Sequence, residues 1–170
     1  MRNLITYEEI SQLARPCTTD REMAEAMIAE AQRIEIKPRL GDALYLKLLE
    51  KAPEDRFMTL LEGGIWENRC KEQNLLTGIK TALAYYTLAR ITRDGNIQET
   101  RYGSVQKDDQ YSTDPEKTER QRQYRELFGQ ADSYMAEALN YLAQNRQAFP
   151  EYKTCAKMRS NRMTIKTIGK

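Results

Sequence analysis

Apolar residues recur at helical spacing in several separate stretches of the chain. Residues 6–9 (Thr-Tyr-Glu-Glu) have the form of a capping box, which predicts a short helix over residues 7–14. Residues 19–22 (Thr-Asp-Arg-Glu) form a second such box, and a longer amphipathic helix is predicted from there to about Ile36, with Pro38 ending it. The apolar positions of that second helix are Ala24, Met27, Ile28, Ala31 and Ile34.

Four further helices follow from the same kind of pattern. They are predicted over residues 40–51, 54–62, 75–91 and 118–145. The stretch 75–91 is apolar most of the way round, which is typical of a helix that is central or that is covered on one side by a partner subunit. Its main stripe consists of Leu75, Ile79, Ala82, Tyr86 and Ala89.

Two segments do not follow the helical pattern. Along residues 97–111 the type of side chain alternates from one residue to the next, which indicates an extended or hairpin-like excursion. Residues 107–117 are polar. The whole segment 97–117 is therefore predicted to be a mobile excursion. The β-branched alternation in residues 163–168 is compatible with a C-terminal strand. Ile65 and Trp66, which follow a glycine pair, are expected to pack onto the core.

The predicted fold class is all-α or mainly α. We expect a compact helical bundle in one domain, residues 1–152, with the excursion at 97–117, a possible C-terminal strand, and a basic tail over residues 153–170. The predicted core residues share helical spacing: Ile28, Ile34, Leu44, Leu48, Ile79, Leu83, Tyr86, Leu127, Met135, Leu139 and Leu142.

Charge is divided unevenly along the chain. The net charge is +2, but residues 155–170 contain five basic residues and no acid, so the remainder has 22 basic residues against 25 acidic ones, a net charge of −3. This division suggests that tail and body meet different surroundings, although a solvated tail explains it equally well. Phosphate contact by the tail is possible, but the tail has no aromatic residue for base stacking.

The sequence carries no motif of a catalytic site, although catalysis by carboxylates or lysine remains possible in principle. The chain has no histidine, which excludes Ser-His and Cys-His nucleophile pairs and imidazole metal ligands. Its three cysteines are widely spaced, and the chain has no glycine-rich phosphate loop. We therefore expect no enzyme activity, no cofactor and no bound metal. Without a long apolar run or a signal peptide, we expect a cytosolic protein that does not enter a membrane.

Tyrosine is common, with ten copies against three phenylalanines. Tyrosine is favoured at protein interfaces because it joins an apolar ring to a polar hydroxyl, although packing at the edge of the core explains most of the ten. The candidate interface or partner-contact residues are Tyr85, Tyr102, Tyr111, Tyr134, Lys157, Arg159, Arg162 and Lys166.

The order of these parts resembles a known family. The pattern includes Ile10, residues 24–36, Pro-Arg-Leu-Gly-Asp-Ala-Leu-Tyr at 38–45, residues 78–80 and 82–90, Thr-Arg-Tyr-Gly-Ser-Val at 100–105, and Phe-Pro-Glu-Tyr at 149–152. It is similar to the head–tail connector (adaptor) proteins of tailed bacteriophages and prophages, in a longer variant found in prophages of gut Bacteroidales.

The resemblance implies a structural function. Such proteins are small helical subunits that form a ring, commonly of twelve copies, which lies beneath the portal, extends the DNA channel and receives the tail. The expected partners are further copies of the chain, the portal protein, tail-completion proteins and, non-specifically, packaged DNA. The expected location is the host cytoplasm during assembly and then the head–tail junction of the virion.

Two features of the sequence bear on how such a subunit would work. We expect the helices at 75–91 and 118–145 to supply the ring contacts, and the family's mobile central segment maps to residues 97–117. The alternative function is a cytosolic helical binding module that holds nucleic acid through its basic tail.

Overall fold

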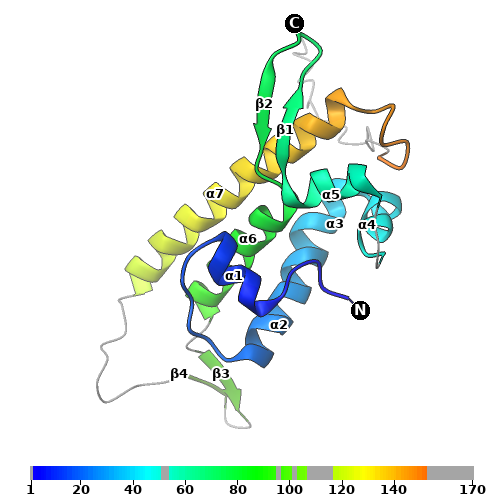
Figure 1. The fold of residues 1–170 in the computed structure, drawn as a ribbon. Coiled ribbons are helices and arrows are strands. Elements are labelled where there is room, and N and C mark those ends of the chain that lie inside the picture. Colours follow the sequence, from blue (N-terminus) through cyan, green and yellow to red (C-terminus); the bar gives the residue numbers. More distant parts are fainter. Residues whose placement is uncertain (1, 51–53, 95–96, 101–102, 107–116, 153–170) are drawn as a thin grey trace, which may run out of the picture.

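In a computed structural model the chain is mainly α-helical, as the apolar spacing predicts (Figure 1). The structure describes residues 2–50, 54–94, 97–100, 103–106 and 117–152. The helical elements are α1 (Tyr7–Leu13), α2 (Arg21–Ala31), the π-helical turn η1 (Gln32–Ile36), α3 (Lys37–Leu40), α4 (Asp42–Leu48), α5 (Asp55–Glu62), α6 (Ile79–Asp94) and α7 (Lys117–Gln144). The strands are β1 (Gly64–Glu67), β2 (Gln73–Leu76), β3 (Ile97–Thr100) and β4 (Gly103–Gln106).

Helix α6 lies at the centre of the molecule. The long helix α7 packs along it on one side, and α1, α2 and α5 contact it as well (Figure 1). Its buried residues lie on nearly every side of the helix: Ile79, Ala82, Leu83, Ala84, Tyr86, Thr87, Leu88, Ala89, Arg90 and Ile91. The wide apolar surface of this helix is therefore covered largely within the subunit.

Helix α7 buries a narrow seam against α6. Ala131, Met135, Ala138 and Leu142 are completely buried and follow one another at steps of four, three and four residues, which places them on one side of the helix. The opposite side is exposed and polar, with residues such as Glu126, Ser133 and Asn140. Most of the predicted core is buried, but Leu139 is only half-buried.

The prediction that Ile34 belongs to the core is wrong. The helix that starts at α2 does not stay α-helical, because residues 32–36 form a π-helical turn. A π turn inserts one extra residue, so the buried positions after Ala31 become Gln32 and Ile36. Ile34 is turned to the surface, where 52% of it is exposed.

Several predicted helix boundaries are also wrong. The side chain of Asp20, rather than that of Thr19, caps α2 by accepting hydrogen bonds from two backbone N–H groups. Pro38 lies in the first turn of α3, where its missing N–H is harmless, and Gly41, with a φ of 80°, separates α3 from α4. Helix α6 begins at Ile79, because Leu75 and Leu76 belong to strand β2.

Two pairs of antiparallel strands complete the described fold. Strands β3 and β4 pair residues 97–100 with residues 103–106, so the described part of the predicted excursion is a pair of antiparallel strands. Strands β1 and β2 form a hairpin, which the sequence pattern did not reveal. This β1–β2 hairpin projects beyond the helices at the end of the molecule where α5 ends and α6 begins (Figure 1).

Candidate interaction surface

Two glycines fix the direction of the β1–β2 hairpin at its base. Gly63 and Gly78 have φ angles of 91° and 93°, a region that favours glycine. A Cβ atom on Gly63 would lie 2.3 Å from the carbonyl oxygen of Leu76, and one on Gly78 would lie 2.6 Å from that of Leu61. The two ends of the hairpin therefore pack backbone against backbone, which leaves little freedom for the hairpin to swing.

The hairpin is also fastened along α7. Three contacts join them, at the base, midway and near the turn: Thr77 to Glu137, Trp66 to Tyr141, and Arg69 to the carbonyl of Gln144. The Thr77 hydroxyl donates to the Glu137 carboxylate at 2.8 Å, and the ring centroids of Trp66 and Tyr141 are 5.1 Å apart in an edge-to-face arrangement. The α7 residues lie at steps of four and three, so a single face of α7 holds the hairpin.

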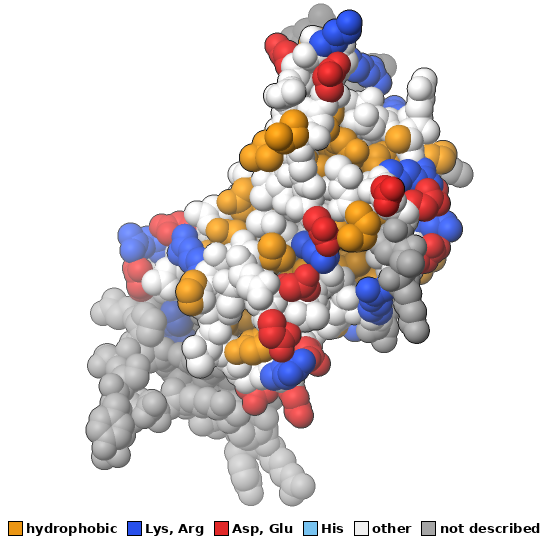
Figure 2. Space-filling view, viewed as in Figure 1, with side chains coloured by type: hydrophobic (Ala, Val, Ile, Leu, Met, Phe, Trp, Pro, Cys, Tyr) orange, Lys and Arg blue, Asp and Glu red, His pale blue; other side chains and the backbone are white. Residues whose placement is uncertain are grey.

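The opposite face of the hairpin has no partner in the described part of the chain. Side chains alternate between the two faces of a strand, so Ile65 and Glu67 of β1 lie on the side away from Trp66. Ile65 pairs directly with Leu75 of β2, and each is 72% exposed. Glu67 pairs with Gln73 one step nearer the turn. We call these four residues the hairpin outer face, and Figure 2 shows apolar side chains at the surface near its base.

Two further exposed apolar side chains lie on η1 and α4. Among the described residues, the large exposed hydrophobic side chains are Ile65 and Leu75 on the hairpin, and Ile34 and Leu46 on these two elements. Arg33 directly precedes Ile34 on η1, and α3 connects η1 to α4. We call Arg33, Ile34 and Leu46 the η1–α4 face.

The structure brings together two of the residues that the sequence marked as candidate contacts. The rings of Tyr85 on α6 and Tyr134 on α7 lie 5.2 Å apart, and both residues are half-buried at the seam between these helices. Burial raises the pKa of Tyr134, and the neighbouring Tyr85 raises it further. The pair mainly joins α6 to α7. The other candidates, Tyr102, Tyr111, Lys157, Arg159, Arg162 and Lys166, lie outside the described residues.

Sequence reasoning missed the hairpin outer face, although one signal for the hairpin was present. The side chain of Asn68 accepts hydrogen bonds from the backbone N–H groups of Cys70 and Glu72, and Lys71 adopts a φ of 63°. An asparagine that folds the following residues into a turn in this way is a recognised turn signal. The two four-residue strands beside it are too short for their alternation to stand out.

Polar side chains on α6 form links to the surrounding elements. The Lys80 ammonium pairs with carboxylates from α1 and α5, Tyr86 bonds with residues of α3 and α7, and Arg90 pairs with carboxylates from α2 and η1. The partners are Glu9 and Glu62 for Lys80, Arg39 and Asp132 for Tyr86, and Glu30 and Glu35 for Arg90. Burial, followed by the hydrogen bond to Asp132, raises the pKa of Tyr86, which keeps its hydroxyl protonated. These groups are occupied in joining helices.

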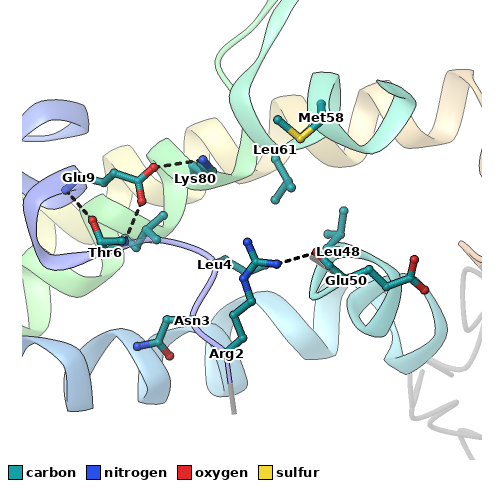
Figure 3. A pocket seen from close by; sticks show the side chains of 11 residues that line it. Arg2, Asn3, Leu4, Thr6, Glu9, Leu48, Glu50, Met58, Leu61 and Lys80 are labelled. Carbon is teal, nitrogen blue, oxygen red and sulfur yellow. Dashed lines mark hydrogen bonds and ion pairs between the residues drawn. The ribbon is translucent and has the colours of Figure 1, made fainter. Parts of the chain in front are cut away.

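A hollow of about 320 Å³ lies between the N-terminal segment, α1, α4, α5 and α6 (Figure 3). Its walls combine apolar side chains, such as Met58 and Leu61, with Lys80 and Arg2. Lys80 is already paired with acids, and Arg2 donates to the Glu50 carbonyl at 2.7 Å. Both cations that line the hollow are therefore engaged by acceptors of the chain itself.

Metal and membrane sites were searched over the same part of the chain. The described residues contain no cluster of three or more side chains suited to hold a metal ion. No helix within the described ranges is both long and apolar enough to cross a membrane.

The fold and these surfaces define a class of small, mainly helical proteins that carry a rigidly held β-hairpin with an apolar outer face. Comparison with family models matches residues 36–162 to a family of unknown function, DUF6712. The match begins at Ile36, the last residue of η1, and covers most of the chain, so the chain belongs to this family. No curated protein and no solved structure matches it.

Proposed function

We propose that the chain is a structural subunit of an oligomeric ring that joins the portal of a phage or prophage head to the tail around the DNA channel. The proposal starts from the resemblance of its helix order to head–tail connector proteins. The observation that carries it further is the hairpin outer face, because Ile65 and Leu75 are held in a fixed position and are left uncovered. An uncovered apolar pair on a fixed projection supports the proposal of a protein contact at this place.

Ring contacts in this proposal come from projecting elements instead of from the two long helices. Helix α6 is covered by neighbouring elements of its own subunit, and the apolar seam of α7 is used against α6. The exposed side of α7 is polar, as Glu126 and Asn140 illustrate. In a protein contact, most of the affinity comes from a few side chains that become buried when the partners bind. The hairpin offers exposed apolar side chains for this purpose, and the polar side of α7 does not.

The experiment is native mass spectrometry and electron microscopy of the purified chain, alone and with the portal protein of the same prophage. We expect rings, alone at high concentration or on the portal. The double variant Ile65→Ser with Leu75→Ser should abolish them, whereas the matched pair Ser133→Ala with Asn140→Ala on the outer side of α7 should not. A wild-type chain that stays monomeric and unbound under all these conditions would refute the ring.

The same preparation tests the alternative of a nucleic-acid binding module. That alternative depends on residues 155–170, which lie outside the described residues. A monomer that binds arbitrary DNA with steep salt dependence would favour it. If the ring is correct, deleting residues 155–170 should instead weaken assembly or docking, most visibly at low salt, because charge attraction extends about 10 Å at 0.1 M ionic strength and less at higher salt.

A further inference from the structure

We propose that the hairpin outer face of one copy docks on the η1–α4 face of the next copy, so that a ring is closed by two unlike surfaces of the same chain. This inference rests on the proposed ring function and names the two halves of its contact. The large exposed hydrophobic side chains of the described residues divide evenly between these surfaces, with Ile65 and Leu75 on one and Ile34 and Leu46 on the other.

The hairpin outer face and Ile34 are too far apart to cover each other within one subunit. The hairpin leaves the body beside Ile79, at the start of α6. Next to Ile34 on η1, Glu35 is tied to Arg90 by an ion pair of 2.9 Å. Ile79 and Arg90 are eleven residues apart on α6, which is about 17 Å along the helix axis. Because the contacts with α7 also fix the hairpin, its outer face can meet Ile34 only on another copy.

Charge favours the contact between unlike surfaces over a contact between two hairpins. Glu67 lies on the hairpin outer face, and Arg33 lies beside Ile34. Neither residue forms a hydrogen bond or an ion pair with another described side chain, so both charges are available to a neighbour. Docking hairpin against hairpin would instead bring two Glu67 carboxylates into one interface, and like charges disfavour such pairing.

A contact between unlike surfaces is the kind that can close a ring, provided that the rotation from one copy to the next completes a circle. Each copy that joins uses its hairpin on one neighbour and offers its η1–α4 face to another, so one of each always remains free until the circle closes. A contact between two identical surfaces would end at a dimer. The arrangement of the exposed apolar residues therefore fits the geometry that the proposed function requires.

The test uses two single variants and their mixture. Leu75→Glu places a charge on the hairpin, and Ile34→Glu places one on η1. Each alone should lose all species larger than a monomer in native mass spectrometry. Mixed in equal amounts, they should form dimers and nothing larger, because the mixture retains one intact hairpin and one intact η1–α4 face. Gln121→Glu, an exposed change on α7, is the control and should assemble like the wild type.

The outcomes separate this inference from the proposed function. If the wild type forms rings while the mixture stays monomeric, or if either variant still forms rings, the pairing of these two faces is wrong and the ring stands. If the wild type never assembles, alone or with portal protein, both fail. Melting curves of the variants should match the wild type, because both substituted side chains are exposed.

Charge reversal provides a second readout. Glu67→Lys and Arg33→Glu should each weaken assembly about tenfold, and the double variant should recover most of the loss, since the pair is then restored in the opposite sense. Equal loss in the double variant would show that these two residues do not meet.

Discussion

The ion pairs of Arg90 allow a sharp test of how the central helix is held. The Arg90 side chain is almost fully buried, and its two terminal nitrogens contact Glu30 at 2.6 Å and Glu35 at 2.9 Å. Arg90→Met keeps a long apolar side chain but removes the charge. It leaves Glu35, which is 14% exposed, without its cation, whereas Glu30 is 53% exposed and can turn to water.

The expected loss follows from these exposures. Removing one partner of a fully buried ion pair costs about 3–5 kcal/mol, while an exposed pair contributes about 0–1 kcal/mol. Glu35 is not completely buried, and Nε of Arg90 has no hydrogen-bond partner in the described part of the chain, so the net value is smaller than for an ideal pair. We expect Arg90→Met to lower the free energy of unfolding by about 2–4 kcal/mol.

Urea unfolding followed by circular dichroism measures this change. The carboxylate variants should rank in the order of burial, with Glu35→Gln costing about 1–3 kcal/mol and Glu30→Gln less than about 1 kcal/mol. Arg93→Met is the matched control, since Arg93 on the same helix is 46% exposed, pairs with its neighbour Asp94 and lies over the ring of Tyr124. A loss below about 1 kcal/mol for Arg90→Met, or a larger loss for Glu30→Gln than for Glu35→Gln, would refute the reasoning.

Three other changes test separate parts of the structure. Leu83→Ala should cost about 2–5 kcal/mol in urea unfolding, because Leu83 is completely buried on α6, and a loss under about 1 kcal/mol would contradict a central α6. Trp66→Ala should speed amide exchange in β1 and β2 about tenfold without affecting α6, because it releases the hairpin from Tyr141. Burial raises the pKa of Asp132, but the hydrogen bonds and charge from Tyr86 and Arg39 outweigh burial and lower it overall. The contribution of Asp132 to stability is therefore present above the ordinary pKa of about 3.9 and is lost as the pH falls below that value. In Asp132→Asn the urea midpoint should therefore change less with pH in that range than it does in the wild type. An equal change of the midpoint with pH in both proteins would contradict this.

The periodicity of apolar residues was sufficient to predict which residues are buried in the elements that form regular helices. Helix α7 shows this best, because a 28-residue helix presents its seam at constant spacing, and Met135 and Leu142 are buried as predicted. The central place of α6 also followed from its wide apolar surface, although the sequence left open whether a partner subunit covers it. In the structure, the subunit's own α1, α2, α5 and α7 contact it.

The hairpin could not be predicted in the same way. The apolar residues Leu75 and Leu76 continue the pattern of α6, so the sequence joins them to that helix. Gly78, with its positive φ, separates the two elements, and only the close approach to the end of α5 shows why it must be a glycine. The contact of Gly78 with the end of α5 therefore determines where β2 ends and α6 begins. The two segments are distant in sequence, so the local pattern of residues does not reveal this contact.

The π turn η1 links the buried core to the proposed contact surface. The side chain of Gln32 is completely buried, and its amide accepts a hydrogen bond from the Leu4 backbone and donates to Asn3. An uninterrupted α-helix would direct Ile34 inward instead, as the spacing of α2 predicts. The extra residue of the π turn lets Glu35 reach Arg90 while Ile34 faces solvent, so one local change of helix geometry both completes a buried ion pair and exposes an apolar side chain. The bonds of Gln32 and Glu35 thus accompany the π turn that leaves Ile34 exposed, which is the residue that the proposed contact uses.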